Sequence, residues 1–137
     1  MKTFLLFFTS LILSCSAQQS KYNLVVKKLD ENYQLKLDSG KFMLEAEREY
    51  AMKLDSLMNV IYDDLIVAKK ADNENIEIEQ NKWISQNNVR IQNIWKPLNK
   101  SMNEIGFIPN DEKMFAYSKQ AQLTRKRVLE LINKFTN

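Results

Sequence analysis

The chain has 137 residues with a formal net charge of +3, and hydrophobic residues make up 45% of it. This is enough for one small domain with a modest core, and the near balance of charge creates no field that favours nucleic acid. Histidine is absent, which excludes hydrolase triads and zinc sites that depend on an imidazole.

Glycine and proline are scarce, with two of each in the whole chain. Because these residues mark turns, their scarcity predicts a few long helices rather than many short strands. We therefore expect an all-α fold.

Residues 1–17 have the pattern of a secretory signal peptide. Lys2 supplies the positive start, an apolar run follows from Phe4 to Leu13, and small residues come next. The run of roughly ten residues is too short to cross a bilayer as a permanent helix. The pattern predicts an exported protein.

The only cysteine, Cys15, stands in a sequence that resembles a bacterial lipobox. Ile12 lies three positions before it, Ser14 directly before it and a small residue directly after it. One interpretation is a periplasmic or outer-membrane-anchored lipoprotein that touches the membrane only through lipid on Cys15. The alternative is ordinary cleavage after Ala17 and a secreted protein. In both cases the remaining chain has no internal disulfide.

Residues 18–40 form an N-terminal arm for which the pattern allows two structures. The apolar residues alternate as in a two-stranded hairpin that turns at 30–32. The alternating residues are Leu24, Val26, Tyr33, Leu35 and Leu37. The spacing of Leu24, Lys28 and Glu31 also fits an amphipathic helix. We expect an ordered or half-ordered arm rather than a separate domain.

Residues 41–137 are predicted to form a helical domain. Apolar residues at three- and four-residue steps predict helices over about 41–70, 75–103 and 111–135. Pro97 lacks an amide hydrogen, so it should kink or interrupt the second helix near 93–95. Polar residues at 71–74 and turn residues at 106–110 separate the helices. We predict an antiparallel three-helix bundle with long helices, preceded by the arm.

Two tryptophans lie on the second predicted helix, twelve residues apart. At 3.6 residues per turn, a separation of twelve residues places the two rings on different sides of the helix, so they cannot both face the same part of the core. We expect Trp83 to anchor the core and Trp95, beside the Pro97 kink, to be the more exposed ring. Trp95 with Asn88, Gln92 and Asn99 forms a candidate binding face for sugar or peptide, although amides are also common surface residues.

Clusters of charge predict no metal, cofactor or catalytic site. The acidic residues Asp63 and Asp64 and those at 72–79 lack the central glycine of a calcium loop, so we interpret them as a solvated face and helix caps. The basic triplet 125–127 is shorter than the clusters that typically bind acidic lipid headgroups. A contact between this triplet and a partner protein is the other interpretation.

Three motifs carry a resemblance to a known family. They are Asp55-x-x-Met58-Asn59-x-x-Tyr62-x-x-Leu65, Gln80-x-x-Trp83 and Leu123-Thr124-x-x-Arg127-x-x-x-Leu131. Over about residues 42–135 this pattern resembles the lysozyme inhibitor LprI family, small secreted or lipid-anchored helical domains of bacteria. The family pattern differs in carrying cysteines beside the helices and an arginine where this chain has Asn87.

The resemblance implies a structural role for the polar seam of Asp55, Asn59 and Tyr62, which are spaced i, i+4 and i+7. Asn59 and Tyr62 are expected to hydrogen-bond across to the Gln80–Trp83 turn of the next helix. No catalytic residue is implied.

The resemblance also implies a function. It predicts a non-enzymatic cell-envelope binding protein that inhibits a lysozyme or another wall hydrolase by occluding its substrate groove. Common lysozymes are cationic, so a nearly neutral chain provides no electrostatic steering toward them. The alternative is a structural or assembly lipoprotein that uses the Trp95 face to hold an envelope complex.

Overall fold

The computed structural model describes the backbone of residues 2–136 and the side chains of residues 15–136. Within residues 2–136 every regular element is a helix, which confirms the predicted all-α class. The elements are α1 (Lys2–Asp38), α2 (Met43–Ala68), α3 (Asn73–Trp95), α4 (Leu98–Ile105) and α5 (Asn110–Asn133).

The predicted helices agree closely with α2, α3 and α5. The break expected at Pro97 is present, and it separates α3 from the short α4. Because Pro97 has no amide hydrogen, it cannot donate the backbone hydrogen bond that would continue α3. Helix α4 begins at the next residue. Gly106 then ends α4 in the left-handed region, with φ 79°, a conformation that glycine adopts without steric cost.

The arm at residues 18–40 is helical, so the hairpin alternative is wrong. Tyr22 and Val26 are buried, and Leu29 and Tyr33 continue their line as partly buried residues. These four residues follow steps of four, three and four, which place them on one helical face. Leu35, part of the proposed alternation, is 69% exposed. The chain therefore has a fourth long helix beyond the three that were predicted.

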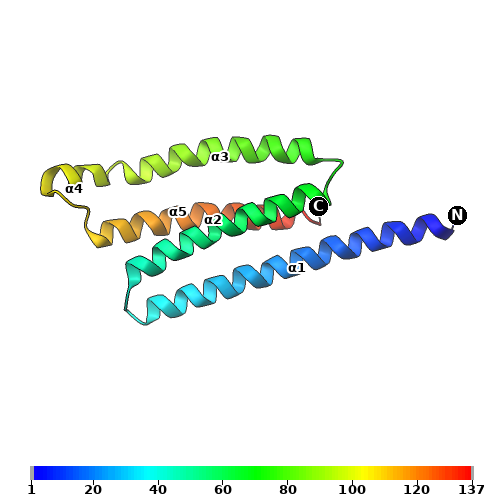
Figure 1. The fold of residues 1–137 in the computed structure, drawn as a ribbon, viewed down its shortest axis with the longest axis horizontal. Helices are drawn as coiled ribbons and strands as arrows, with labels where there is room; N and C mark the ends of the chain where they lie inside the picture. The colour runs from blue at the N-terminus through cyan, green and yellow to red at the C-terminus, as the bar shows by residue number, and fades with distance from the viewer. Residues whose placement is uncertain (1, 137) are drawn as a thin grey trace.

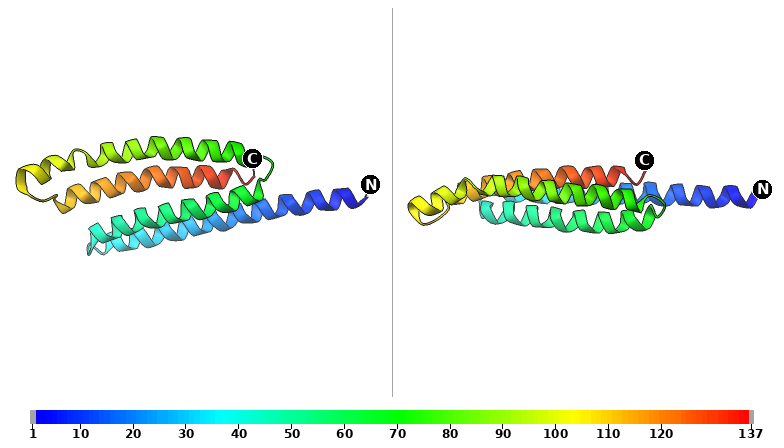
Figure 2. Two further views of the ribbon diagram at one scale, coloured as in Figure 1. Left: turned by 45° about the horizontal axis from the view of Figure 1, so that its top comes forward. Right: turned by 90° about the horizontal axis from the view of Figure 1, so that it is seen from above.

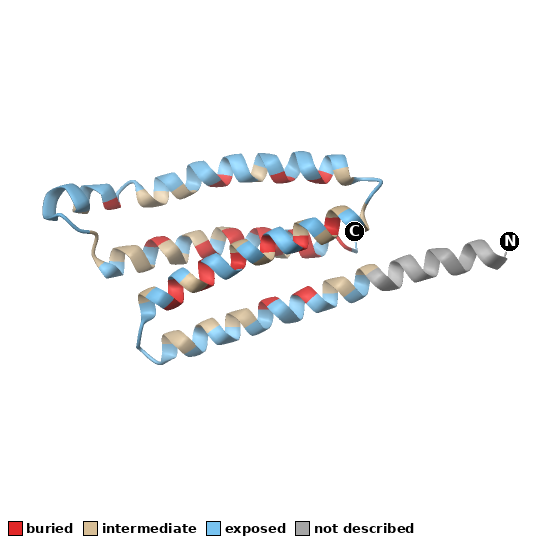
Figure 3. Ribbon diagram, viewed as in Figure 1, coloured by how far each residue is buried: buried red, intermediate tan, exposed pale blue. Residues whose placement is uncertain are grey.

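The helices are arranged around α2 and α5, which make the most extensive contact. Figures 1 and 2 show α1 lying beside α2 on one side, and α3 lying beside α5 on the other. Figure 3 shows buried residues concentrated on the facing sides of α2 and α5. Leu54, Ile61 and Leu65 of α2, with Val128 and Leu131 of α5, are completely buried.

Each of these aliphatic side chains contributes roughly 1.5–3 kcal/mol through burial. The first apolar residue of α2 is not part of this core. Met43 is 37% exposed, because it lies at the end of α2 beside the turn from α1. Leu57 of α2 is partly buried against the core.

The predicted leader lies mostly outside the described side chains, which begin at Cys15. Cys15 itself is half-buried and packs against the core. Among the described residues, no helix combines the length and apolar character that crossing a membrane requires. The described residues also contain no group of three or more side chains suited to holding a metal ion.

Candidate functional site

The second and third sequence motifs meet at Arg127, which is only 5% exposed. Its Nε donates to Oε1 of Gln80 at 2.9 Å, and its Nη1 donates to Oε2 of Glu130 at 3.2 Å. Its guanidinium carbon lies 5.9 Å from the centre of the Trp83 ring. Arg127 therefore joins α5 to the inner face of α3.

The Asp55 carboxylate joins α2 to α5. Thr124 is fully buried and donates its hydroxyl to Oδ1 of Asp55 at 2.8 Å. Burial raises the pKa of Asp55, while hydrogen bonds from Thr124 and Gln120 act in the opposite direction. Thr124 belongs to the Leu123-Thr124 motif, so the first motif meets the third through this bond.

The other two residues of the seam lie differently. Asn59 is exposed and Tyr62 is half-buried, and burial, followed by the charges of Glu77 and Asp63, raises the pKa of Tyr62. The oxygen of Gln80 is bonded by Arg127 instead of by a seam residue. The structural role expected of the seam is thus carried by Asp55.

Tyrosine–carboxylate pairs attach α1 to α2. Tyr22 donates to Asp64, and Tyr33 donates to Oε1 of Glu47 at 2.8 Å. Burial, reinforced by the neighbouring carboxylate, raises the pKa of Tyr22 and of Tyr33 to about 12. These phenols therefore remain protonated at neutral pH, and they act as hydrogen-bond donors between helices.

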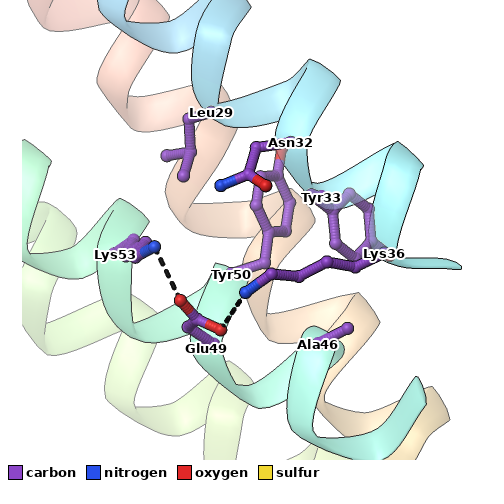
Figure 4. Close-up of a pocket in the computed structure, with 8 residues that line it drawn as sticks. All are labelled: Leu29, Asn32, Tyr33, Lys36, Ala46, Glu49, Tyr50 and Lys53. Carbon is purple, nitrogen blue, oxygen red and sulfur yellow. Dashed lines mark hydrogen bonds and ion pairs between the residues drawn. The ribbon is translucent and has the colours of Figure 1, made fainter. Parts of the chain in front are cut away.

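A small hollow opens between the same two helices (Figure 4). Glu49 bridges Lys36 and Lys53 across it, with the Lys53 contact at 2.6 Å. The hydrogen bonds from Lys36 and Lys53 lower the pKa of Glu49 to about 2. The hollow measures about 10 Å³, room for one water at most. We interpret it as part of the contact between helices.

The predicted Trp95 face is divided in the structure. The Trp95 ring meets Tyr117 edge-on at 4.9 Å, and its Nε1 donates to Oε1 of Gln120 at 3.4 Å. Trp95 therefore packs against α5, and it is half-buried like Trp83. The three amides predicted to share this face are exposed. They are Asn88, Gln92 and Asn99.

The basic triplet 125–127 is also divided. Arg125 pairs with Asp30 of α1, its Nη2 lying 2.7 Å from Oδ2. Arg127 is buried, whereas Lys126 is exposed. Of the three residues in the triplet, only Lys126 is thus available to contact a partner.

Lys126 lines an open groove between α3 and α5, which we call the basic groove. The residues that line it are Arg90, Asn93, Ile94, Lys119, Gln122, Leu123 and Lys126. It combines three cations, two amides and two aliphatic side chains. None of the described residues that line it is acidic.

A signal for the basic groove is present in the sequence but is divided between two segments. Residues 80–103 contain four Lys or Arg residues, residues 113–129 contain five, and neither segment contains Asp or Glu. The total charge of the chain is nearly balanced, so it does not reveal these two basic segments. They form one basic surface only when α3 and α5 lie side by side.

The chain matches no family model, no curated protein and no solved structure. The resemblance to the LprI family therefore stays a prediction. The function has to be inferred from the basic groove and from the contacts around it.

Proposed function

We propose that this protein is a non-enzymatic binding protein of the bacterial cell envelope. The observation that carries the proposal is the basic groove, which is open to solvent and presents cations, amides and aliphatic surface together. A mixed surface of this kind suits a macromolecular partner, since apolar contacts supply affinity and charges supply orientation.

The positions of the titratable groups support a binding role over an enzymatic one. Tyr22 and Tyr33, whose pKa values are raised to about 12, hydrogen-bond to carboxylates at contacts between helices. Glu47 and Asp55, whose pKa values burial also raises, each accept a hydrogen bond from a neighbouring helix. These shifts have a structural explanation in helix packing.

A lysozyme or another wall hydrolase is the first partner to test, because of the resemblance to the LprI family. In this proposal the protein occludes the substrate groove of the enzyme. The cations Arg90, Lys119 and Lys126 repel a cationic lysozyme, so the inhibited enzyme should present a neutral or acidic surface.

The test is hydrolysis of cell-wall substrate with and without the purified chain, at low and moderate salt. Stoichiometric inhibition that persists at moderate salt supports occlusion. Unchanged hydrolysis by every lysozyme class removes this partner and leaves the wider binding proposal in place.

A structural or assembly lipoprotein is the second candidate, and Cys15 favours it. Cys15 lies in the continuous helix α1, which packs against α2 and α5. Lipid on Cys15 would therefore hold the helical domain close to the membrane. Metabolic labelling with a radioactive fatty acid should label the wild type and fail to label Cys15→Ser. Equal labelling would contradict the lipoprotein proposal.

We also propose that the long helices form one antiparallel bundle, in which α1 joins the three that the sequence predicts. Three contacts between distant segments support it: Arg125 to Asp30, Thr124 to Asp55, and Lys134 to Glu79 at 2.8 Å. Disulfide cross-linking of paired cysteines introduced at these contacts tests the arrangement.

The binding proposal itself is tested by capture. The full chain with a C-terminal affinity tag is expressed in its own host, and envelope proteins are cross-linked before isolation. We expect one protein to be recovered in stoichiometric amount with the tagged chain. Recovery of the chain alone, at both low and moderate salt, would contradict the proposal.

A further inference from the structure

We infer that the basic groove binds an acidic amphipathic helix from a partner protein. This inference rests on the proposed function, because it specifies the chemistry of the partner that such a binding protein takes. The partner helix should carry carboxylates on its two flanks and one or two aliphatic side chains between them.

The charges of the basic groove indicate the sign of the partner. Arg90 lies on α3, and Lys119 and Lys126 lie on α5, so cations stand on both sides of the groove. Among the described residues, no carboxylate lies within ion-pair distance of Arg90 or Lys126. Lys119 lies over the Phe115 ring at 4.2 Å. The protein itself thus leaves these cations available to an acidic ligand.

The middle of the groove indicates that the ligand also has an apolar side. Ile94 and Leu123 are half-buried, whereas Asn93 and Gln122 beside them are exposed. An aliphatic side chain of a partner can therefore contact Ile94 and Leu123, while the amides bond to its polar residues. A ligand with charge alone would leave this aliphatic surface in water.

The fold provides an internal example of the same recognition. Helix α1 packs against both α2 and α5, and its Asp30 meets Arg125 of α5. Its buried residues Tyr22 and Val26 supply the apolar contact. Helix α1 thus combines an apolar stripe with an acidic side chain opposite a cation. A partner helix placed between α3 and α5 would repeat this arrangement, as in other helix-in-groove complexes.

An acidic lipid surface is a less suitable ligand for this groove. Ile94 and Leu123 are half-buried, so they do not project as residues that insert into a bilayer do. The strongly exposed apolar residues of this part of the molecule lie outside the lining of the groove, on α3 and α5 as well as on α4 and the loop after it. They include Val89, Met102, Ile105, Phe107 and Phe115.

The experiment is a selection of helix-forming peptides of random surface sequence against the immobilised full chain. Selected peptides are labelled with fluorescein, and their Kd is measured at low and moderate salt. We expect them to carry Asp or Glu at three- and four-residue steps around aliphatic residues. Arg90→Glu and Lys126→Glu should each weaken binding by about tenfold or more, and added salt should reduce the difference.

Lys28→Glu is the matched control, because Lys28 is an exposed cation on α1, outside the lining of the groove. Circular dichroism checks that all three variants keep their helicity. Selected peptides without acidic residues would overturn the inference, and so would equal weakening by Lys28→Glu. If inorganic polyphosphate displaces the peptides and binds as tightly, the groove is a general anion site and the inference fails.

A second copy of the chain is the remaining occupant to exclude. Sedimentation of the wild type should show a monomer. A dimer that Lys126→Glu dissociates would overturn the partner-helix inference. The proposed function is judged separately by capture of an envelope protein. If the Arg90→Glu variant captures the same protein as the wild type, the function stands and only the assignment of the groove fails.

Discussion

Arg125 of α5 and Asp30 of α1 form a forked ion pair between segments ninety-five residues apart in sequence. Nη2 lies 2.7 Å from Oδ2, and Nε lies 3.2 Å from both carboxylate oxygens. The Tyr50 hydroxyl also donates to Oδ1 of Asp30 at 2.5 Å. Asp30 therefore links α1 to both α2 and α5, and it should help to fix α1 in place.

A double-mutant cycle of Asp30→Asn and Arg125→Met measures this link. We expect a coupling free energy of about 1 kcal/mol, decreasing with salt, because both side chains remain partly exposed. The Lys27–Glu31 pair, with side chains 72% and 60% exposed, is the control and should couple by less than about 0.5 kcal/mol. Urea unfolding measures the coupling free energy of each pair. Equal values for the two pairs would contradict the role of Asp30.

Glu47 should make stability depend on pH. It is 7% exposed, its Oε2 has no hydrogen-bond partner among the described residues, and burial raises its pKa. The folded carboxyl thus keeps its proton to a higher pH than the unfolded one. Stability should therefore fall as the pH rises from about 4.5 through the raised pKa.

Glu47→Gln removes this titration but leaves an oxygen that can accept the Tyr33 hydrogen bond. We expect its free energy of unfolding to fall less than that of the wild type between pH 4.5 and pH 7. Urea unfolding at the two pH values measures the difference. Glu45→Gln, at an exposed position of the same helix, should behave like the wild type. If the free energy of unfolding changed equally with pH in Glu47→Gln and Glu45→Gln, groups other than Glu47 would cause the pH dependence.

The Thr124–Asp55 bond should stabilise the contact between α2 and α5. Thr124→Val keeps the shape of the side chain but removes the donor, so the half-buried carboxylate loses a partner. We expect a loss of about 1–2 kcal/mol in the free energy of unfolding. Thr136→Val is the control, since Thr136 is exposed beyond the end of α5, and it should change stability very little. Wild-type stability of Thr124→Val would show that this hydrogen bond contributes nothing.

Arg127 should require the planar guanidinium as well as its charge. Arg127→Lys keeps the charge but loses the fork that reaches Gln80 and Glu130, so we expect a cost of about 2 kcal/mol. In a Trp95→Phe background, the fluorescence of Trp83 reports on the same contact. Arg90→Lys, at an exposed position, should leave both quantities unchanged. Unaltered stability and fluorescence in Arg127→Lys would contradict this interpretation.

Much of the fold was predictable because helix signals are local. Apolar residues repeat at helical steps through α2 and α5, and Pro97 interrupts the backbone hydrogen bonding wherever it stands. Helix α1 was ambiguous because two periods overlap in it. Tyr22, Val26, Leu29 and Tyr33 mark the helical face, whereas the exposed Leu35 belonged to a misleading alternation.

The candidate site was less predictable, because it depends on which helices become neighbours. Lys126 looked like one member of a triplet, yet Arg125 is directed to Asp30, and Arg127 is buried against Gln80. Arg90 lies on α3, more than thirty residues before Lys126. Periodicity shows which side of a helix is polar, but not which cations from two helices share one groove.

Site-specific photo-cross-linking in living cells shows directly whether a partner protein binds in the basic groove. A photoreactive amino acid replaces Gln122 in the basic groove or, as the control, the exposed Asn59 on α2. We expect one adduct from position 122, formed with an acidic helical segment of an envelope protein, and no such adduct from position 59. An adduct from position 59 alone, or equal adducts from both positions, would contradict a partner bound between α3 and α5.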